Sequence, residues 1–371
     1  MTKICKTLLF LLIFINGLAQ SNNLPFRHLT VDDGLPHTDA TGILQDEKGF
    51  IWISTYAGLN RFDGYEIKTF VSKNYHLQNV YLNRINSVFY QKDKIWLATQ
   101  GGLAYFDLKK EEIILPKFNV PNNSNFSSVC TFGNQIFGIS NGKFYVFKEI
   151  ESVFTQTKIN TQIPFVNSIA IDKKGIVYLG TNQGLFTYQN QKFSAFPLQE
   201  KLSSSISFVG FDQQENLLLG FNSGFSVISI NSLLNQNQSI KLNQFTQKTS
   251  DIGDIEGQNV NFVVKDFRDD YWICTPNGIL RFDSKKQIFQ VPFQSNSLSS
   301  KHTNSLMIDK SGSLWVSTFG GGVNFMDLTP KLFNTIRFND HNANYIRAIF
   351  EENENGNLWV GTRTEGLIYY N

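Results

Sequence analysis

Few side chains in this sequence are of the types that carry out enzyme chemistry, and those few are scattered. No two histidines stand at the spacing of a metal-binding pair, and the sequence holds no H-E-x-x-H, G-x-S-x-G or P-loop motif. The histidines are His28, His37, His76, His302 and His341. A metal site shared by His37 and His302, which both precede an alternating apolar segment, is the alternative to separate loop histidines, and we favour loop histidines. The sequence therefore predicts no metal and no cofactor.

Two pairs of adjacent acids, Asp32–Asp33 and Asp269–Asp270, have the residue types that cleave glycosidic bonds. Adjacent residues in a strand or turn point in different directions, so neither pair is well arranged for acid–base catalysis. The acidic segments "EENENGN" and "FRDD" are typical of solvated turns rather than of calcium loops. We therefore predict that this chain is not an enzyme.

A second group of polar residues is better suited to binding than to catalysis. Each member stands just before or at the start of an alternating apolar segment. The group comprises His37, Thr38, Arg84, Asn86, Asn167, Asn261, His302, Asn304 and Arg347. Amide and guanidinium groups suit the hydroxyls and carboxylates of a sugar acid, and Arg84, Asn86 and Arg347 are the preferred contacts. The alternative is that Asn and Thr at strand starts only satisfy the backbone of their own turns.

The element that must position these residues is a repeat. The phrase "GFIWISTYAGLNRFDG" recurs with variations, so that the chain holds eight copies. They are centred on Trp52, Trp96, Phe137, Tyr178, Leu218, Trp272, Trp315 and Trp359. Neighbouring centres lie 40 to 54 residues apart, and the longest interval holds the polar insert "NQNQSIKLNQFTQKTSDIGDIEGQ". A period in the forties with four short strands per unit predicts an all-β propeller.

The seventh copy shows how one unit is built. "NSLMID" is the predicted innermost strand, "SLWVST" the second, "VNFMD" the third, and "KLFNTIRF" can supply an outer strand. Gly312 provides a turn that needs positive φ, and the Asp after the third strand is predicted to cap a turn. Trp315 is predicted to wedge between neighbouring sheets, which are apolar on both faces and stable only when sandwiched. A sugar-stacking row of tryptophans is the alternative.

The number of blades is left open by the repeat itself. We favour a seven-bladed ring over residues 20–335, closed by an N-terminal strand from "PFRHLTV", residues 25–31. The eighth copy, residues 336–371, either completes an eight-bladed ring or opens a second propeller. Channel-facing loops of such a ring bring the polar group above to one face.

The ends and the charge of the chain predict its compartment. Lys3 and Lys6 precede the apolar run "TLLFLLIFI" and the small residues of "NGLAQ", which is typical of a signal peptide over residues 1–19. Cys130 and Cys274 remain after its removal, three repeats apart, and are predicted to be buried free thiols. A net charge of +2 with scattered Lys and Arg argues against nucleic acid as a partner.

The first copy resembles a known family. "FRHLTVDDGLPHTDATGILQDEKGFIWISTYAGLNRFDGYEIKTF" is similar to the first blade of the periplasmic sensor region of Bacteroidetes hybrid two-component systems, the two-component regulator propeller repeats. The matching positions include Gly34, Leu35, Pro36, Asp46, Gly49, Trp52, Thr55, Gly58, Leu59, Arg61 and Phe62. The pattern returns in copies seven and eight and fades through copies three to five.

The resemblance implies a function. It implies a periplasmic module that detects a small ligand, often a glycan-derived oligosaccharide, and signals to further sensor and kinase domains of the same receptor, with a homodimer as a further expectation. Kinase residues are absent from this sequence. The alternatives are a secreted propeller enzyme acting on polysaccharide, as a lyase or glycosidase, and a stand-alone scaffold propeller.

Overall fold

The computed structural model describes residues 26–72, 77–120, 124–159, 162–198, 205–222, 224–230, 243–246, 259–292, 297–329, 345–351 and 357–370. The predicted signal peptide lies outside these residues. Within these ranges, no helix has the length and apolar character that crossing a bilayer requires. The chain divides into two compact units, Met1–Leu328 and Thr329–Asn371, which are described separately.

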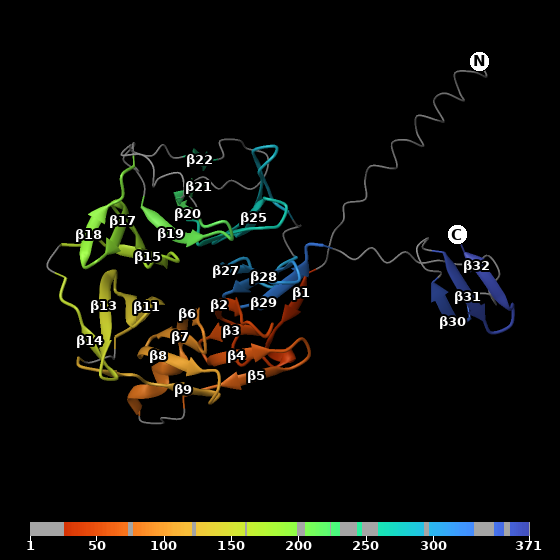
Figure 1. Ribbon diagram of the computed structural model, residues 1–371, viewed down its shortest axis with the longest axis horizontal. Helices are drawn as coiled ribbons and strands as arrows, with labels where there is room; N and C mark the ends of the chain where they lie inside the picture. Colours follow the sequence, from red (N-terminus) through yellow and green to blue (C-terminus); the bar gives the residue numbers. More distant parts are fainter. Residues whose placement is uncertain are drawn as a thin grey trace, which may run out of the picture. The chain divides into compact units, whose positions relative to one another are not determined.

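The first unit contains seven antiparallel sheets, one for each of the first seven sequence copies, arranged radially about a centre (Figure 1). The first sheet consists of β2 (Ala40–Gln45), β3 (Ile51–Thr55), β4 (Gly58–Phe62) and β5 (Ile67–Phe70). The second consists of β6 (Ile85–Gln91), β7 (Lys94–Thr99), β8 (Gly102–Asp107) and β9 (Glu112–Ile114). The third consists of β11 (Phe126–Phe132), β12 (Gln135–Ser140), β13 (Lys143–Ile150) and β14 (Val153–Gln156), with β10 (Lys117–Phe118) added parallel to β14.

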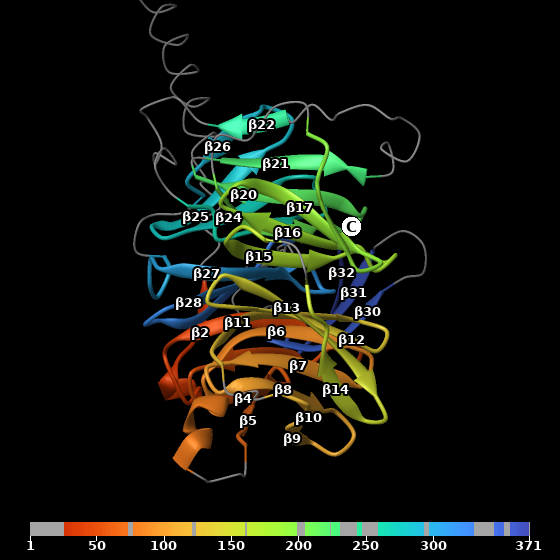
Figure 2. The ribbon, with the colours of Figure 1, turned by 90° about the vertical axis from the view of Figure 1, so that its left-hand side faces the viewer.

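The remaining four sheets follow the same order from the centre outward. The fourth consists of β15 (Val166–Ile171), β16 (Val177–Thr181), β17 (Gly184–Gln189) and β18 (Lys192–Ala195). The fifth consists of β19 (Ile206–Phe211), β20 (Asn216–Phe221), β21 (Gly224–Ser229) and β22 (Asn243–Thr246), and the sixth of β23 (Phe262–Lys265), β24 (Tyr271–Thr275), β25 (Gly278–Asp283) and β26 (Ile288–Gln290). The seventh consists of β27 (Thr303–Ile308), β28 (Ser313–Thr318), β29 (Gly322–Asp327) and β1 (Arg27–Leu29). Figure 2 turns the ring so that the third and fourth sheets face the viewer.

The ring closes on itself. Each innermost strand packs against the innermost strand of the next sheet, and β27 of the seventh sheet packs against β2 of the first. The N-terminal strand β1 supplies the outer strand of the seventh sheet, with Leu29 opposite Val323. The predicted propeller closed by an N-terminal strand is therefore confirmed. The segment "KLFNTIRF", an alternative source of that strand, lies outside the described residues.

Two short 3₁₀ helices lie in the connections of this unit. The first is η1 (Val31–Asp33), between β1 and β2, and the second is η2 (Leu77–Asn83), before β6. At η1, Thr30 and Asp33 form a reciprocal cap, because Asp33 accepts the Thr30 backbone N–H at 2.8 Å.

The four tryptophans of the ring are packed between sheets, as predicted, whereas Trp359 of the second unit is only partly buried and packs against Tyr369 of its own sheet. Trp52, Trp96, Trp272 and Trp315 are all buried, and Trp52 shares its apolar cluster with Leu97 and Phe106 of the second sheet. A carboxylate six residues earlier holds the indole in three of these copies. Asp309 Oδ2 accepts the Trp315 indole N–H at 2.8 Å, and its Oδ1 accepts the backbone N–H of Ser313 at 2.9 Å. The Asp of the repeat therefore fixes a turn and an inter-sheet wedge together.

The Asp residues after the third strands cap turns, which was also predicted. Asp63 Oδ1 accepts the backbone N–H groups of Tyr65 and Glu66, both at 2.8 Å. These backbone hydrogen bonds lower the pKa of the Asp63 carboxyl. Asp283 makes the corresponding bonds to Lys285 and Lys286.

The second unit holds one three-stranded antiparallel sheet of β30 (Ile346–Glu351), β31 (Leu358–Thr362) and β32 (Leu367–Tyr370). It has the strand order of a blade without the outer strand. Its strands expose large apolar side chains, among them Ile349 at 62% and Phe350 at 64%, more than any large apolar side chain in the described strands of the ring, where Ile150 at 52% is the most exposed.

Candidate functional site

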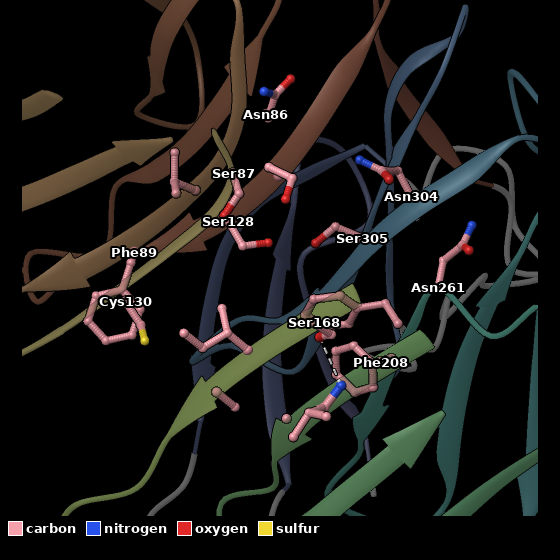
Figure 3. A pocket seen from close by; sticks show the side chains of 18 of the residues that line it. Asn86, Ser87, Phe89, Ser128, Cys130, Ser168, Phe208, Asn261, Asn304 and Ser305 are labelled. Atoms are coloured by element: carbon pink, nitrogen blue, oxygen red, sulfur yellow. Dashed lines mark hydrogen bonds between the residues drawn. The ribbon is translucent and has the colours of Figure 1, made fainter. Parts of the chain in front are cut away.

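The innermost strands of all seven sheets enclose a cavity of about 790 Å³ at the centre of the ring (Figure 3). This volume is within the usual range for small-molecule sites. Its wall combines amides, hydroxyls and aromatic rings, and its only ionisable lining side chain among the described residues is the thiol of Cys130. A neutral wall of this kind suits an uncharged, hydrogen-bonding ligand part.

One irregularity recurs near the start of the innermost strands. The pairing with the second strand shifts by one residue, which leaves a bulged residue directed away from the regular ladder. The bulged residues are Thr41, Asn86, Ser127, Asn167, Ser207 and Asn304, and Asn261 occupies the same place before β23. All seven line the cavity.

These bulged side chains join neighbouring sheets. Six of the seven donate a hydrogen bond to a backbone carbonyl of the following sheet. The bonds run from Thr41 to Ile85 (2.7 Å), Asn86 to Phe126 (2.6 Å), Asn167 to Ile206 (2.9 Å), Ser207 to Val260 (2.7 Å), Asn261 to Thr303 (3.0 Å) and Asn304 to Thr41 (2.6 Å). Ser127 is the exception, because its hydroxyl donates to Ile139 of its own sheet. We call this set the bulge belt.

The bulge belt determines what its amides can offer a ligand. Asn86 Nδ2 also donates to Asn125 Oδ1, and Asn167 Nδ2 to Ser205 Oγ, both at 2.8 Å. Both amide hydrogens of each residue are therefore used, and only Oδ1 remains for the cavity. The sequence predicted these amides as contacts for the hydroxyls and carboxylates of a sugar acid. Their remaining atoms accept hydrogen bonds, so of these two groups they suit the hydroxyls.

The residue after each bulge forms a second layer of the wall, and this layer is asymmetric. It presents small or hydroxyl side chains on five sheets, Gly42, Ser87, Ser128, Ser168 and Ser305. On the fifth and sixth sheets it presents Phe208 and Phe262, whose ring centroids are 4.7 Å apart. A Cβ at Gly210 would lie 2.5 Å from the Phe208 ring, so glycine there leaves the ring its place. Sequence reasoning missed this layer, although its position after the bulge repeats in every copy.

The predicted contacts outside the bulge belt are dispersed. Arg84 precedes β6 at the end of the ring where the second and third strands of each sheet are joined, and it is exposed. His302 precedes β27 and is exposed, with its carbonyl accepting the Phe319 N–H, but it does not line the cavity. Arg347 lies in β30 of the second unit, exposed, and is described with that unit alone.

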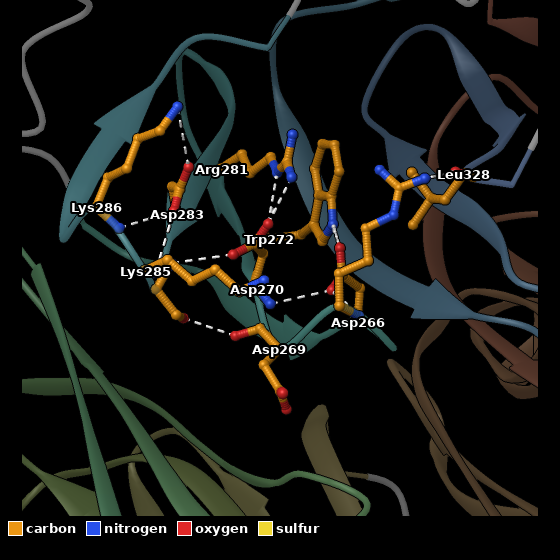
Figure 4. A network of polar contacts seen from close by, with 11 residues as sticks. Asp266, Asp269, Asp270, Trp272, Arg281, Asp283, Lys285, Lys286 and Leu328 are labelled. Atoms are coloured by element: carbon orange, nitrogen blue, oxygen red, sulfur yellow. Dashed lines mark hydrogen bonds and ion pairs between the residues drawn. The ribbon is translucent and has the colours of Figure 1, made fainter.

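The paired acids have structural partners. Asp270 accepts two hydrogen bonds from Arg281 and one from the Ser284 backbone (Figure 4). Asp269 pairs with Lys265 at 2.9 Å. Asp33 caps η1. Across the described residues, no group of three His, Cys, Asp or Glu side chains is placed to hold a metal ion.

Comparison with known proteins places this geometry among propellers. The model of the family described as "Two component regulator propeller" matches residues 34–57, which confirms the resemblance seen in the first copy. Over 65 residues the chain is 37% identical to histidine kinase P4 of Formosa agariphila, a match that covers 18% of this chain and 5% of that protein.

Solved structures support the same fold. The extracellular domain assigned to the hybrid two component system BT4673 from B. thetaiotaomicron matches with a TM-score of 0.65 and 18% identity, over 93% of this chain and 46% of that one. The corresponding domain of BT3049 from the same organism matches with a TM-score of 0.63 and 20% identity, over 94% and 48%. A virginiamycin B lyase from Staphylococcus aureus also matches, with a TM-score of 0.62 and 14% identity, over 82% and 99%. The chain thus spans about half the length of the extracellular domains that it resembles.

Proposed function

We propose that this chain is the periplasmic ligand-sensing part of a hybrid two-component histidine-kinase receptor, and that its ligand is a glycan-derived oligosaccharide. The observation that carries the proposal is the central cavity, with its neutral wall of amide oxygens, serine hydroxyls and one aromatic pair. The family match at residues 34–57 and the similarity to extracellular domains of hybrid two-component systems support the sensory role.

The cavity wall favours a sugar over other neutral ligands. Sugar hydroxyls can donate to the free oxygens of Asn86 and Asn167, and can accept from serine hydroxyls. Ser168 Oγ already accepts the Val209 backbone N–H at 3.0 Å, so its own hydrogen is available to a ligand. Phe262, which is partly buried beside Phe208, offers an apolar surface for the C–H face of a sugar ring.

Signalling requires partners that the ligand can bias. We expect these to be further domains of the same receptor or a second protomer, with ligand binding favouring one arrangement through its differential affinity. The second unit fits such an extension. Its exposed apolar side chains, among them Ile349, Phe350 and Leu367, are those that a neighbouring blade would cover, and the first seven sheets already form a closed ring. We therefore propose that residues 336–371 open a second propeller.

Calorimetric titration of the mature chain, residues 20–371, with oligosaccharides from plant, algal and animal glycans tests the proposal. We expect saturable binding of at least one oligosaccharide without turnover. Absence of binding across the panel would contradict the sensory proposal. New reducing ends or unsaturated products, abolished by single substitutions at cavity residues, would instead favour a propeller enzyme of the kind represented by the lyases.

A further inference from the structure

One sector of the ring face that carries Arg84 differs from the rest. In each sheet, one residue can be compared directly: the first residue of the turn that follows the second strand. From the first to the seventh sheet it is Tyr56, Gln100, Asn141, Asn182, Asn222, Pro276 and Phe319. Only the first and seventh sheets have an aromatic residue there, and ring closure makes these sheets neighbours. The Tyr56 and Phe319 ring centroids are 6.2 Å apart.

This aromatic pair stands at the entrance to the central cavity. Phe319 is among the residues that line the cavity, and Tyr56 contacts it from the neighbouring sheet. The His37 ring packs edge-on to Tyr56, with centroids 5.9 Å apart. Tyr56, Phe319 and His37 are all only partly buried, so ring surface remains accessible.

Backbone hydrogen bonds hold the pair in place. The Gly320 N–H, next to Phe319, donates to Asp39 Oδ1 at 2.7 Å, and the Gly322 N–H donates to the Thr38 carbonyl at 2.7 Å. Asp39 N–H in turn donates to His37 Nδ1 at 3.0 Å, which holds the His37 ring against the same loop. A pre-organised aromatic surface of this kind loses little entropy when a ligand binds.

A cation lies on the same ring face as the aromatic pair, before the first strand of the second sheet. Arg84, on the next sheet, is exposed, and its Cζ is 5.4 Å from the Tyr81 ring centroid. Its guanidinium makes one long hydrogen bond, from Nη1 to Gln100 Oε1 at 3.5 Å, and none of the described carboxylates forms an ion pair with it. The Thr41 hydroxyl of the first sheet donates to the Ile85 carbonyl at 2.7 Å, so Arg84 stands next to a direct contact between the first and second sheets. Burial and the Asp39 carboxylate raise the pKa of the Tyr56 hydroxyl, and the Arg84 charge opposes them.

We propose that Tyr56, Phe319 and Arg84 form a subsite at the cavity entrance that binds one sugar ring carrying an acidic group. The aromatic pair packs against the face of the ring, and the Arg84 guanidinium pairs with a carboxylate or sulfate on it. Asp39 Oδ2 accepts hydroxyls on the opposite side. This inference rests on the proposed function. It adds that the oligosaccharide carries an acidic ring, and that it binds with this ring at the entrance and an uncharged part in the cavity.

Calorimetry with matched pairs of probes tests this subsite in the mature chain. The acidic probes are trimers of galacturonate, of a glucuronate-containing glycan and of a sulfated galactan, and each is paired with its methyl-esterified or desulfated form. We expect at least one acidic probe to bind about tenfold or more tightly than its neutral form, the factor that one charge-assisted hydrogen bond provides. Which pair discriminates distinguishes carboxylate from sulfate.

Three variants locate the effect. Arg84→Gln should weaken the acidic probe about tenfold or more and remove its advantage over the neutral form. Phe319→Leu should weaken both forms, because stacking does not depend on charge. Lys143→Gln is the matched control: it removes an exposed cation at the same end of the third sheet, and should change affinity by about twofold at most. Thermal unfolding verifies that each variant is folded.

The outcomes separate this proposal from the proposed function. Equal affinity for acidic and neutral forms, or an Arg84→Gln effect no larger than that of Lys143→Gln, overturns the subsite while saccharide binding stands. If none of the probes or neutral forms binds, the subsite is overturned, and the proposed function is decided by the wider oligosaccharide panel.

Discussion

The hydrogen bond between the Asp of a repeat and the indole of its tryptophan allows a quantitative prediction for the sixth sheet. Asp266 is buried, its Oδ1 accepts the backbone N–H groups of Arg268 (2.8 Å) and Asp270 (3.0 Å), and its Oδ2 accepts the Trp272 indole N–H at 2.9 Å (Figure 4). Asp266→Asn keeps one acceptor oxygen and replaces the other with an N–H₂ group. If the oxygen stays on the turn, the amide faces the indole N–H, and two donors meet in a buried place.

The cost follows from these contacts. Leaving one buried donor without an acceptor costs about 1–3 kcal/mol, and the loss of negative charge weakens the two remaining bonds as well. We therefore expect Asp266→Asn to lower the free energy of unfolding by about 2–4 kcal/mol. Urea unfolding followed by circular dichroism measures it, with the slope of the transition checked against the unmodified protein.

A double-mutant cycle isolates the indole bond. Trp272→Phe removes the donor, so it should cost about 1–3 kcal/mol less in the Asp266→Asn background than in the unmodified protein. Asp172→Asn in the fourth sheet is the matched control. Its indole is replaced by the Tyr178 hydroxyl, 3.4 Å from Asp172 Oδ2, and a phenol oxygen can accept from the new amide. Strict additivity in the cycle, or an equal loss of stability from Asp266→Asn and Asp172→Asn, would show that the Asp–indole hydrogen bond does not stabilise the sheet.

Three further predictions follow from the same contacts. Burial raises the pKa of the Cys274 thiol to about 12 and that of Cys130 still further, so both thiols should stay protonated at pH 8. A colorimetric thiol assay should therefore detect them only after denaturation. Leu29→Asp places a charge in the buried seam where β1 closes the ring, and should cost about 3 kcal/mol or more and increase proteolysis of the native protein. Asn304→Ala removes the bulge-belt bond to Thr41 and should cost about 1 kcal/mol in urea unfolding, with a smaller effect expected for Ser127→Ala, whose hydroxyl joins no second sheet.

The repeat made the fold predictable from sequence because it records packing that must recur. Trp52, Trp272 and Trp315 each follow an Asp by six residues, and each donates its indole N–H to that Asp. The same sequence pattern thus records the same contact in three sheets. The N-terminal closing strand was predictable for a related reason, since the last sheet of a ring otherwise lacks an outer partner. The blade-like character of residues 346–370 was also predictable, because this sheet repeats the strand order of the ring. That it belongs to a second propeller is the proposal made above.

The sequence predicted polar residues at the starts of the innermost strands, and four of them line the cavity, but it did not predict their hydrogen bonds. Asn86 and Asn167 were expected to contact hydroxyls or carboxylates, and the structure adds that the neighbouring sheet takes both amide hydrogens of each residue, which a sequence does not record. The aromatic pair at the entrance depends on a contact between residues far apart in the sequence. Tyr56 and Phe319 belong to opposite ends of the ring-forming chain and meet only because the seventh sheet closes against the first. Repeat positions that deviate from their own pattern at that seam are therefore the residues most informative about ligand binding. The conserved features of each copy build a symmetric ring, whereas recognition of an asymmetric ligand requires that symmetry to be broken.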